Sequence, residues 1–180
     1  MNVCVFCGSA TGKNPVFAEA AQELATQLFN SKSTLVYGGG NIGLMGILAD
    51  RIMDLGGKVI GVIPDFLMKK EVGHKGITQL EVVDSMHVRK RRMADLTDVF
   101  IALPGGWGTL DELAEILTWK QLGLIEGEIG MLNTNNYFDP LILQMKMMVD
   151  EGFLHPNSLK ELKISNSPQQ LLIQLGVITV

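Results

Sequence analysis

A basic run of four cations follows Met86, and one of them occupies an apolar position. At 100° per helical residue, Met86, Met93 and Leu96 fall on one apolar stripe. Arg89 lies inside that stripe, whereas Arg91 points well away from it. A buried guanidinium is costly unless a carboxylate or phosphate pairs with it. We therefore expect Arg89 to face a polar cavity or an anionic ligand; the alternatives are a solvated basic face and a stem that packs and snorkels.

Glu112 is the second candidate, because it opens an expected helix just after a glycine-rich turn. Thr109 and Glu112 match a capping box, which would be a purely structural role. A carboxylate beside a phosphate-binding turn can also stabilise a developing oxocarbenium ion or orient a water, as the breaking of a glycosidic bond demands. Adjacent helix positions diverge by about 100°, so Asp111 and Glu112 do not form a close pair. Both interpretations of Glu112 stay open on these grounds.

Three glycine-rich turns, Gly8–Gly12, Gly38–Gly43 and Gly105–Thr109, each follow an expected strand and open an expected helix. The free amides and the positive dipole end of a helix start bind phosphate, and glycine lets the main chain approach it closely. One such turn would only indicate a tight connection. Three of them in one chain favour a phosphorylated ligand. The expected contacts in the first two turns are Ser9, Gly40 and Gly43.

Two other kinds of phosphate site fit less well. Gly8–Lys13 lacks the spacing of a P-loop, the motif that binds nucleoside triphosphates. Asn14 also follows Lys13 where a P-loop has Ser or Thr. Gly38–Gly43 does satisfy G-x-G-x-x-G, and Asp65 lies about twenty residues further on, as in dinucleotide-binding chains. An NAD(P)-binding oxidoreductase is therefore a weaker alternative.

The cysteines and histidines do not form a metal site in sequence. Cys4 and Cys7 lie on opposite faces of an expected strand, with no second pair to complete a zinc site. His74, His87 and His155 are scattered, without the spacing of a metallohydrolase or a catalytic triad. We expect neither a metal nor a cofactor.

Short apolar strands alternate with segments of helical spacing along the whole chain. The expected strands are Val3–Phe6, Thr34–Tyr37, Lys58–Ile63, Ile77–Val83, Val99–Leu103 and Ile129–Leu132. The expected helices are Pro15–Phe29, Leu44–Leu55, His87–Leu96, Leu110–Leu122, Tyr137–Asp150 and Pro168–Leu175. This alternation predicts a single α/β domain over 1–180, Rossmann-like and doubly wound, with a mostly parallel sheet. Such a sheet binds its ligand at the carboxyl ends of its strands.

The charge composition of the chain limits which kinds of molecule it can bind. The chain has 180 residues, is 47% hydrophobic, and carries 15 Lys and Arg against 19 Asp and Glu for a net charge of −4. That balance supplies no broad positive field for nucleic acid or an anionic membrane. No long apolar run and no basic, cleavable start are present, so we expect a cytoplasmic protein.

Four segments carry a specific family pattern: Cys7–Ser9, Val36–Gly46, Ser85–Lys90 and Pro104–Glu112. Together they resemble the LONELY GUY family of cytokinin riboside 5'-monophosphate phosphoribohydrolases, and the likeness covers nearly the whole chain. Older labels for this family read "lysine decarboxylase". Pyridoxal phosphate chemistry needs a Schiff-base lysine and a partner for the ring nitrogen, and no motif here supplies them.

The resemblance implies hydrolysis of the N-glycosidic bond of a purine nucleoside 5'-monophosphate, AMP or N6-prenylated AMP, without a metal. The essential arginine and glutamate of the family fall on Arg89 and Glu112. Loop amides would hold the 5'-phosphate, Glu112 would stabilise the ribosyl cation or position water, and Arg89 would orient Glu112 and the sugar. The further contacts that it implies are Glu71, Lys90, Gly105, Gly106, Trp107, Gly108, Thr109, Leu110, Asp111 and Thr118.

This chain departs from the family at Trp107, where Tyr is usual, and at Asp111, where Glu is usual. The resemblance also implies a homodimer, and the cluster that contains Met145, Met147 and Met148 fits either a core or a face for a second subunit. The main alternative is a carrier that binds a nucleotide or a cofactor, such as molybdenum cofactor, without catalysis.

Overall fold

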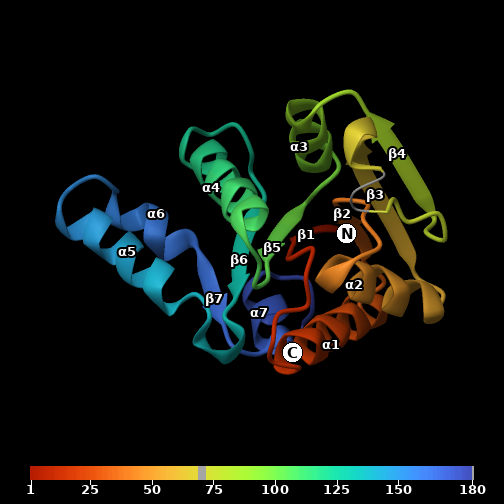
Figure 1. Cartoon of the computed structure of the whole chain (residues 1–180). Coiled ribbons are helices and arrows are strands. Elements are labelled where there is room, and N and C mark those ends of the chain that lie inside the picture. Colours follow the sequence, from red (N-terminus) through yellow and green to blue (C-terminus); the bar gives the residue numbers. More distant parts are fainter. Residues whose placement is uncertain (69–71, 180) are drawn as a thin grey trace.

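Seven parallel strands form one sheet in the computed structural model, which describes residues 1–68 and 72–179 (Figure 1). The strands are β1 (Asn2–Phe6), β2 (Thr34–Tyr37), β3 (Lys58–Pro64), β4 (Gln79–Val83), β5 (Val99–Ala102), β6 (Glu128–Leu132) and β7 (Lys163–Ser165). Their order is β4-β3-β2-β1-β5-β6-β7, and each neighbouring pair is parallel. The predicted doubly wound α/β fold is confirmed.

Alternation along β1 shows how the sheet separates two cores. Val3 and Val5 join one buried cluster, whereas Cys4 and Phe6 join the other. Successive side chains of a strand point to opposite faces, so a strand covered on both sides must be apolar throughout. Cys4 pairs in register with residues of both neighbouring strands, and β1 is the fourth of the seven strands, at the centre of the sheet.

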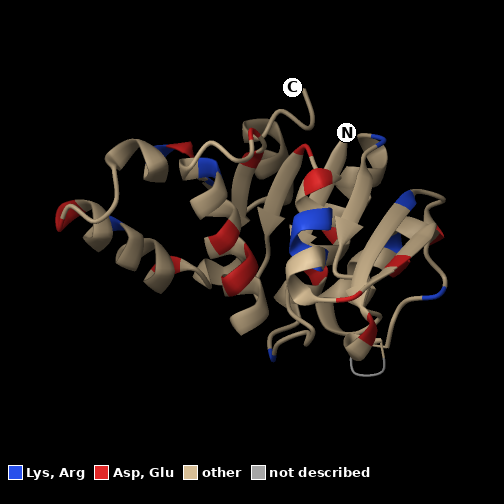
Figure 2. Cartoon of the chain, turned by 90° about the horizontal axis from the view of Figure 1, so that it is seen from above, with Lys and Arg blue, Asp and Glu red and all other residues tan. Residues whose placement is uncertain are grey.

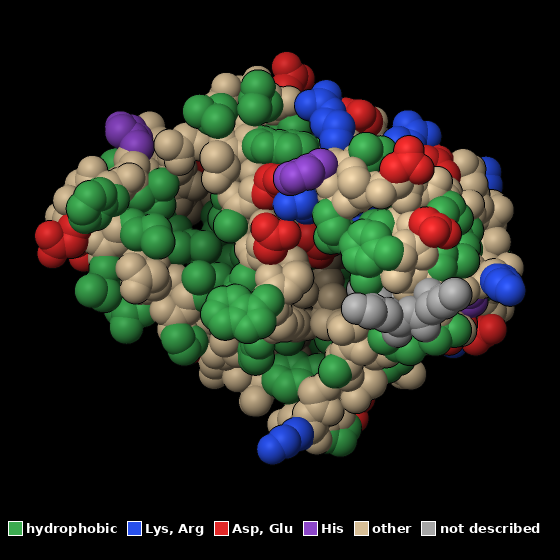
Figure 3. All heavy atoms as spheres, turned by 45° about the horizontal axis from the view of Figure 1, so that its top comes forward, with side chains coloured by type: hydrophobic (Ala, Val, Ile, Leu, Met, Phe, Trp, Pro, Cys, Tyr) green, Lys and Arg blue, Asp and Glu red, His purple; other side chains and the backbone are tan. Residues whose placement is uncertain are grey.

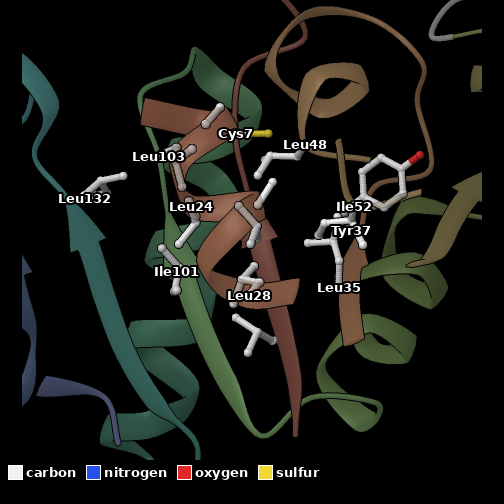
Figure 4. Packing of buried hydrophobic residues seen from close by; sticks show 14 of the residues in the cluster. Cys7, Leu24, Leu28, Leu35, Tyr37, Leu48, Ile52, Ile101, Leu103 and Leu132 are labelled. Atoms are coloured by element: carbon white, nitrogen blue, oxygen red, sulfur yellow. The ribbon is translucent and has the colours of Figure 1, made fainter. Parts of the chain in front are cut away.

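Helices cover both faces of the sheet (Figure 1). On one face lie α1 (Val16–Asn30), α2 (Gly43–Asp54) and α7 (Pro168–Gln174). On the other lie α3 (Met86–Asp95), α4 (Trp107–Gln121), α5 (Asp139–Asp150) and α6 (Pro156–Glu161). Figure 4 shows Leu24 and Leu28 of α1 among strand residues such as Leu35 and Ile101. The helices α5 and α6 extend away from the rest of the domain, as Figure 2 also shows.

Three details differ from the predicted elements. The strand β7 and the helix α6 are missing from the prediction, because three and six residues are too few to show a hydrophobic period. Helix α5 begins at Asp139, since the short 3-10 turn η2 (Thr134–Asn136) precedes it; a second such turn, η1 (Asp65–Leu67), follows β3. Helix α4 begins at Trp107, one turn before the prediction.

Among the described residues, no helix combines the length and hydrophobicity needed to cross a bilayer.

Candidate active site

The strand order fixes where a ligand can bind. Chain connections run outward in opposite directions from β1 and β5, so a crevice opens where these two strands end. The turn after β1 and the turn after β5 meet there, because the Gly8 amide donates to the Pro104 carbonyl at 3.1 Å. The turn after β2 joins them, since the Leu44 amide donates to the Gly8 carbonyl at 3.0 Å. All three glycine-rich turns thus meet at the carboxyl ends of the strands.

Two of these glycines are required by space. Gly43 has a φ of +60°, and a Cβ there would overlap the backbone of Ser9 and Ala10. A Cβ on Gly105 would overlap the Thr109 side chain and would lie 2.9 Å from the Gly8 nitrogen. The turns are packed against one another so closely that side chains are excluded between them.

Arg89 faces inward, as the apolar stripe predicts. It is only 5% exposed on α3, and its Nη2 donates to the Gly38 carbonyl at 3.1 Å. Its Nη1 lies 3.7 Å from the Met86 sulfur. Helix α3 begins at this point because the Ser85 hydroxyl accepts the Val88 amide at 3.3 Å. The interpretation of the run as a solvated basic face is therefore wrong for Arg89.

The other three cations of α3 pair with side chains of this chain. Lys90 Nζ lies 3.2 Å from Asp111 Oδ2 and 3.1 Å from Glu115 Oε1, both on α4. Arg91 pairs with Asp95 at 2.8 Å and lies over the Trp119 ring, and Arg92 pairs with Glu81 of β4 at 2.7 Å. These contacts fix α3 between α4 and the edge of the sheet, and so set the position of Arg89.

Glu112 lies in the second turn of α4, and the predicted capping box is wrong. Gly106 is the N-cap, and no side chain caps the helix. Thr109 is therefore the third helical residue, where its hydroxyl cannot act as a cap. That side chain is buried, with the whole residue 2% exposed, and its Oγ1 has no hydrogen-bond partner in the described part of the chain. The first amides of α4 and this hydroxyl are suited to bind an anion.

A cavity of about 200 Å³ brings Arg89 and Glu112 together with the start of α4. Several predicted contacts line it: Ser9, Gly106, Trp107, Gly108 and Thr109. Trp107 is 89% exposed at its mouth. Figure 3 shows acidic and basic side chains gathered beside a hollow on this side of the molecule. The cavity pairs a buried cation with a carboxylate next to free helix amides.

Other predicted contacts lie outside this lining. Lys90 and Asp111 are paired with each other, and Gly105 lines an adjacent cavity of about 240 Å³. Leu110 and Thr118 line an apolar groove between α4 and the α5–α6 pair. Gly40 pairs with Gly73 in an isolated bridge, and Gly43 packs against Ser9. Glu71 lies outside the described residues.

Gly38, Leu67 and Cys7 also line the cavity, and none of them is among the individual site residues predicted from the sequence. Gly38 could have been found, because it opens the second glycine-rich turn. Leu67 could not, since a single apolar residue after a strand has no distinguishing pattern. The only sequence signal at Cys7 is that it belongs to Cys7–Ser9, one of the segments that resemble the family.

Electrostatics also connect Arg89 and Glu112. Burial and then the negative charge of Glu112 raise the pKa of the Cys4 thiol well above its ordinary value, while Arg89 acts in the opposite direction. The thiol therefore stays protonated and unreactive. Arg89 and Glu112 line one cavity together with Val5 and Phe6, which follow Cys4 on β1. Within the described residues, no three His, Cys, Asp or Glu side chains are grouped to hold a metal ion.

A family model and individual relatives both match this chain in sequence. The family model described as "Possible lysine decarboxylase" matches residues 45–175. A cytokinin riboside 5'-monophosphate phosphoribohydrolase of Arabidopsis thaliana is 43% identical over 173 residues, which cover 96% of this chain and 80% of the relative. One from Oryza sativa subsp. japonica is 42% identical over 173 residues, which cover 96% of this chain and 72% of the relative.

Comparison with solved structures supports the fold. A molybdenum cofactor binding protein of Rippkaea orientalis superimposes with a TM-score of 0.70 at 20% identity, over 97% of this chain and 93% of that one. The Moco carrier protein of Chlamydomonas reinhardtii gives 0.69 at 20% identity, over 97% and 98% of the two chains. At this identity the likeness concerns the fold alone.

Proposed function

The chain belongs to the family of cytokinin riboside 5'-monophosphate phosphoribohydrolases, and from this premise we propose that it hydrolyses the N-glycosidic bond of purine nucleoside 5'-monophosphates. The products are the free base and ribose 5-phosphate. AMP and N6-prenylated AMP are the substrates. The observation that carries the proposal is the cavity shared by Arg89, Glu112 and the uncapped start of α4.

The 5'-phosphate binds at the start of α4. Gly106 leaves the first helical amides without a side-chain cap, and the buried Thr109 hydroxyl has no partner among the described residues. Phosphate oxygens accept from both kinds of donor, and the helix dipole favours their charge. We therefore expect nucleosides, which lack the 5'-phosphate, to be poor substrates.

Hydrolysis proceeds beside the phosphate. The C1'–N9 bond breaks with its electron pair going to the base, positive charge develops on the ribose, and the base takes up a proton. Water then adds to C1' and loses a proton. Glu112 stabilises the ribosyl cation or positions that water, and Arg89 orients Glu112 and the sugar. Fixed charges in a small cavity provide much of the rate enhancement.

Lysine decarboxylation fits the site less well. Lys90 is the lysine nearest in sequence to Arg89, and a Schiff base requires a neutral amine. Although partial burial lowers it, hydrogen bonds with Glu115 and Asp111 raise the pKa of Lys90 above its ordinary value. The amine thus stays charged and paired between α3 and α4.

The proposal includes a cytoplasmic homodimer. Leu143, Met147 and Met148 expose apolar surface on α5, and Phe153 follows them. They adjoin a groove of about 360 Å³ between α4 and α5–α6 whose lining is mostly apolar (Figure 3). A contiguous apolar surface of this kind is typical of a subunit contact. The chain has two cysteines, Cys4 and Cys7, and this sparing use of cysteine fits a reducing compartment.

The substrate test is chromatographic. Purified protein without added metal is incubated with AMP, with isopentenyladenosine 5'-monophosphate and with the two corresponding nucleosides, and released base is quantified. We expect base from the monophosphates only. Binding of AMP without release of adenine would favour a carrier, and saturable binding of NAD or NADP in a parallel titration would favour an oxidoreductase.

A further inference from the structure

Tyr137 contacts the phosphate-binding turn from outside the elements that carry Arg89 and Glu112. It lies between η2 and α5, and its hydroxyl donates to the Gly105 carbonyl at 2.6 Å. Its ring packs edge-on against Phe17 and Phe138, with ring centroids 5.8 Å and 5.2 Å away. The residue is still 44% exposed. Packing on two sides therefore directs the hydroxyl toward Gly105.

The contact acts on a peptide group that faces the ligand. In a trans peptide the carbonyl and the following N–H point in opposite directions. The Gly105 carbonyl and the Gly106 N–H belong to one such group, so the hydroxyl that holds the carbonyl also sets the direction of the amide. Gly106 lines the cavity of Arg89 and Glu112, and it lines the adjacent cavity of Tyr137 as well. The peptide group thus lies between the two cavities.

This peptide needs an external restraint. Gly105 and Gly106 are consecutive glycines, whose backbone is the freest of any residue pair. Packing limits Gly105 on two sides, since a Cβ there would meet the Thr109 side chain and the Gly8 nitrogen. Gly106 has open space around the position of a Cβ. The Tyr137 hydrogen bond is therefore a restraint on the rotation of the connecting peptide.

Tyr137 is itself held firmly. The buried Asn133 at the end of β6 accepts the Phe138 amide on its Oδ1 at 2.7 Å and donates from Nδ2 to Asp139 at 2.8 Å. Between them, Asn135 and Asn136 adopt φ values of 54° and 58°, which fixes a tight turn. The turn that follows β6 thus holds the Tyr137 hydroxyl against the turn that follows β5.

We propose that Tyr137 is a positioning residue that orients the Gly105–Gly106 peptide toward the 5'-phosphate of the substrate. This inference rests on the proposed function, because the phosphate is the ligand that the oriented amide binds. Tyr137 acts through the peptide and not by contact with the reacting atoms.

The test compares Tyr137→Phe with wild type in AMP turnover, in AMP affinity by calorimetry and in competitive inhibition by ribose 5-phosphate. Phenylalanine keeps the ring packing and removes the hydroxyl. We expect KM, Kd and the inhibition constant each to rise on the order of fivefold, because one hydrogen bond that orders the turn is lost. We expect kcat and the melting temperature to change little.

Tyr37→Phe is the matched control, since it removes the other tyrosine hydroxyl, which is buried and has no hydrogen-bond partner among the described residues. It should leave all three constants unchanged. Unchanged constants in Tyr137→Phe would overturn the proposal, and so would a lower melting temperature with only kcat reduced. If wild type neither binds nor hydrolyses AMP, the proposed function itself fails, which is a separate result.

Discussion

Arg89 depends on a neighbour that has no side chain. Its Nη2 donates to the Gly38 carbonyl, and a Cβ on Gly38 would overlap the guanidinium. The glycine is therefore required because Arg89 packs directly on its backbone. The first glycine of the G-x-G-x-x-G motif, which suggests a dinucleotide site, is therefore explained by its packing against Arg89.

Gly38→Ala should lower kcat/KM for AMP on the order of 100-fold, because it displaces the guanidinium from its place beside Glu112. Steady-state kinetics measure this. In an Arg89→Ala background the same change should have little further effect, since the group that it displaces is gone. Equal losses in both backgrounds would show that Gly38 does not act through Arg89.

Substitution of Thr109 can distinguish a role in substrate binding from a role in folding stability. Its buried hydroxyl has no partner in the described part of the chain, so the folded protein gains nothing from it. Thr109→Val should leave the free energy of unfolding unchanged or raise it by up to about 1 kcal/mol, and should raise the KM for AMP roughly tenfold. Denaturant unfolding and kinetics test both parts. Thr109→Ser, which keeps the hydroxyl, should retain the KM; a strong loss of stability in Thr109→Val would contradict a phosphate role.

At the scale of elements, α3 carries the site because its cations are paired on two sides. Lys90 connects it to α4 through Asp111 and Glu115, and Arg92 connects it to β4 through Glu81. Helical spacing from the sequence was enough to predict that Arg89 faces inward. It could not predict these pairs, because their partners lie on other elements.

Glu81→Gln should reveal one of these pairs through pH. The hydrogen bond with Arg92 lowers the pKa of Glu81 below its ordinary value of 4.5. A lowered folded-state pKa gives stability that is present above the ordinary value and is lost as pH falls through the folded-state value. Arg92 is partly exposed, so the pair contributes less than about 1 kcal/mol. Melting temperatures should differ between wild type and variant at neutral pH and converge in acid; a difference that persists in acid would contradict the pairing.

The start of α4 differs from the start that the sequence pattern predicts. Thr109 and Glu112 have the spacing of a capping box, yet Gly106 caps the helix and leaves the Thr109 hydroxyl inside it. Backbone geometry decided between two plausible starts. Tyr137 carries no sequence signal at all, because it reaches Gly105 across 32 positions of chain. The alternating pattern predicted the sheet, its direction and the glycine-rich edge, but not the short β7 and α6.

At the scale of the whole molecule, the α5–α6 pair extends away from the rest of the domain (Figure 1). Exposed apolar side chains on α5 border a groove that one subunit leaves open. This exposed apolar surface is the observation behind the proposed homodimer. The order of the strands explains why the cavity of Arg89 and Glu112 lies far from the edge strands.

Leu143→Asp combined with Met147→Asp should convert a dimer into a monomer, because charge on the apolar face is costly to bury. Light scattering after gel filtration gives the mass of each. Val82→Asp, an exposed apolar position on β4, is the control and should leave the dimer intact. A monomeric wild type, or a double variant that remains dimeric, would contradict this assignment of the contact.

The catalytic role of Glu112 is tested by the rate of adenine release from AMP by Glu112→Gln, with AMP affinity measured on the same preparation. We expect kcat to fall at least about a hundredfold while Kd changes little, because the carboxylate acts in the transition state and the phosphate provides most of the binding. Glu23→Gln, an exposed position on α1, should keep full activity. Undiminished release of adenine by Glu112→Gln would contradict the assignment of Glu112 as the catalytic carboxylate.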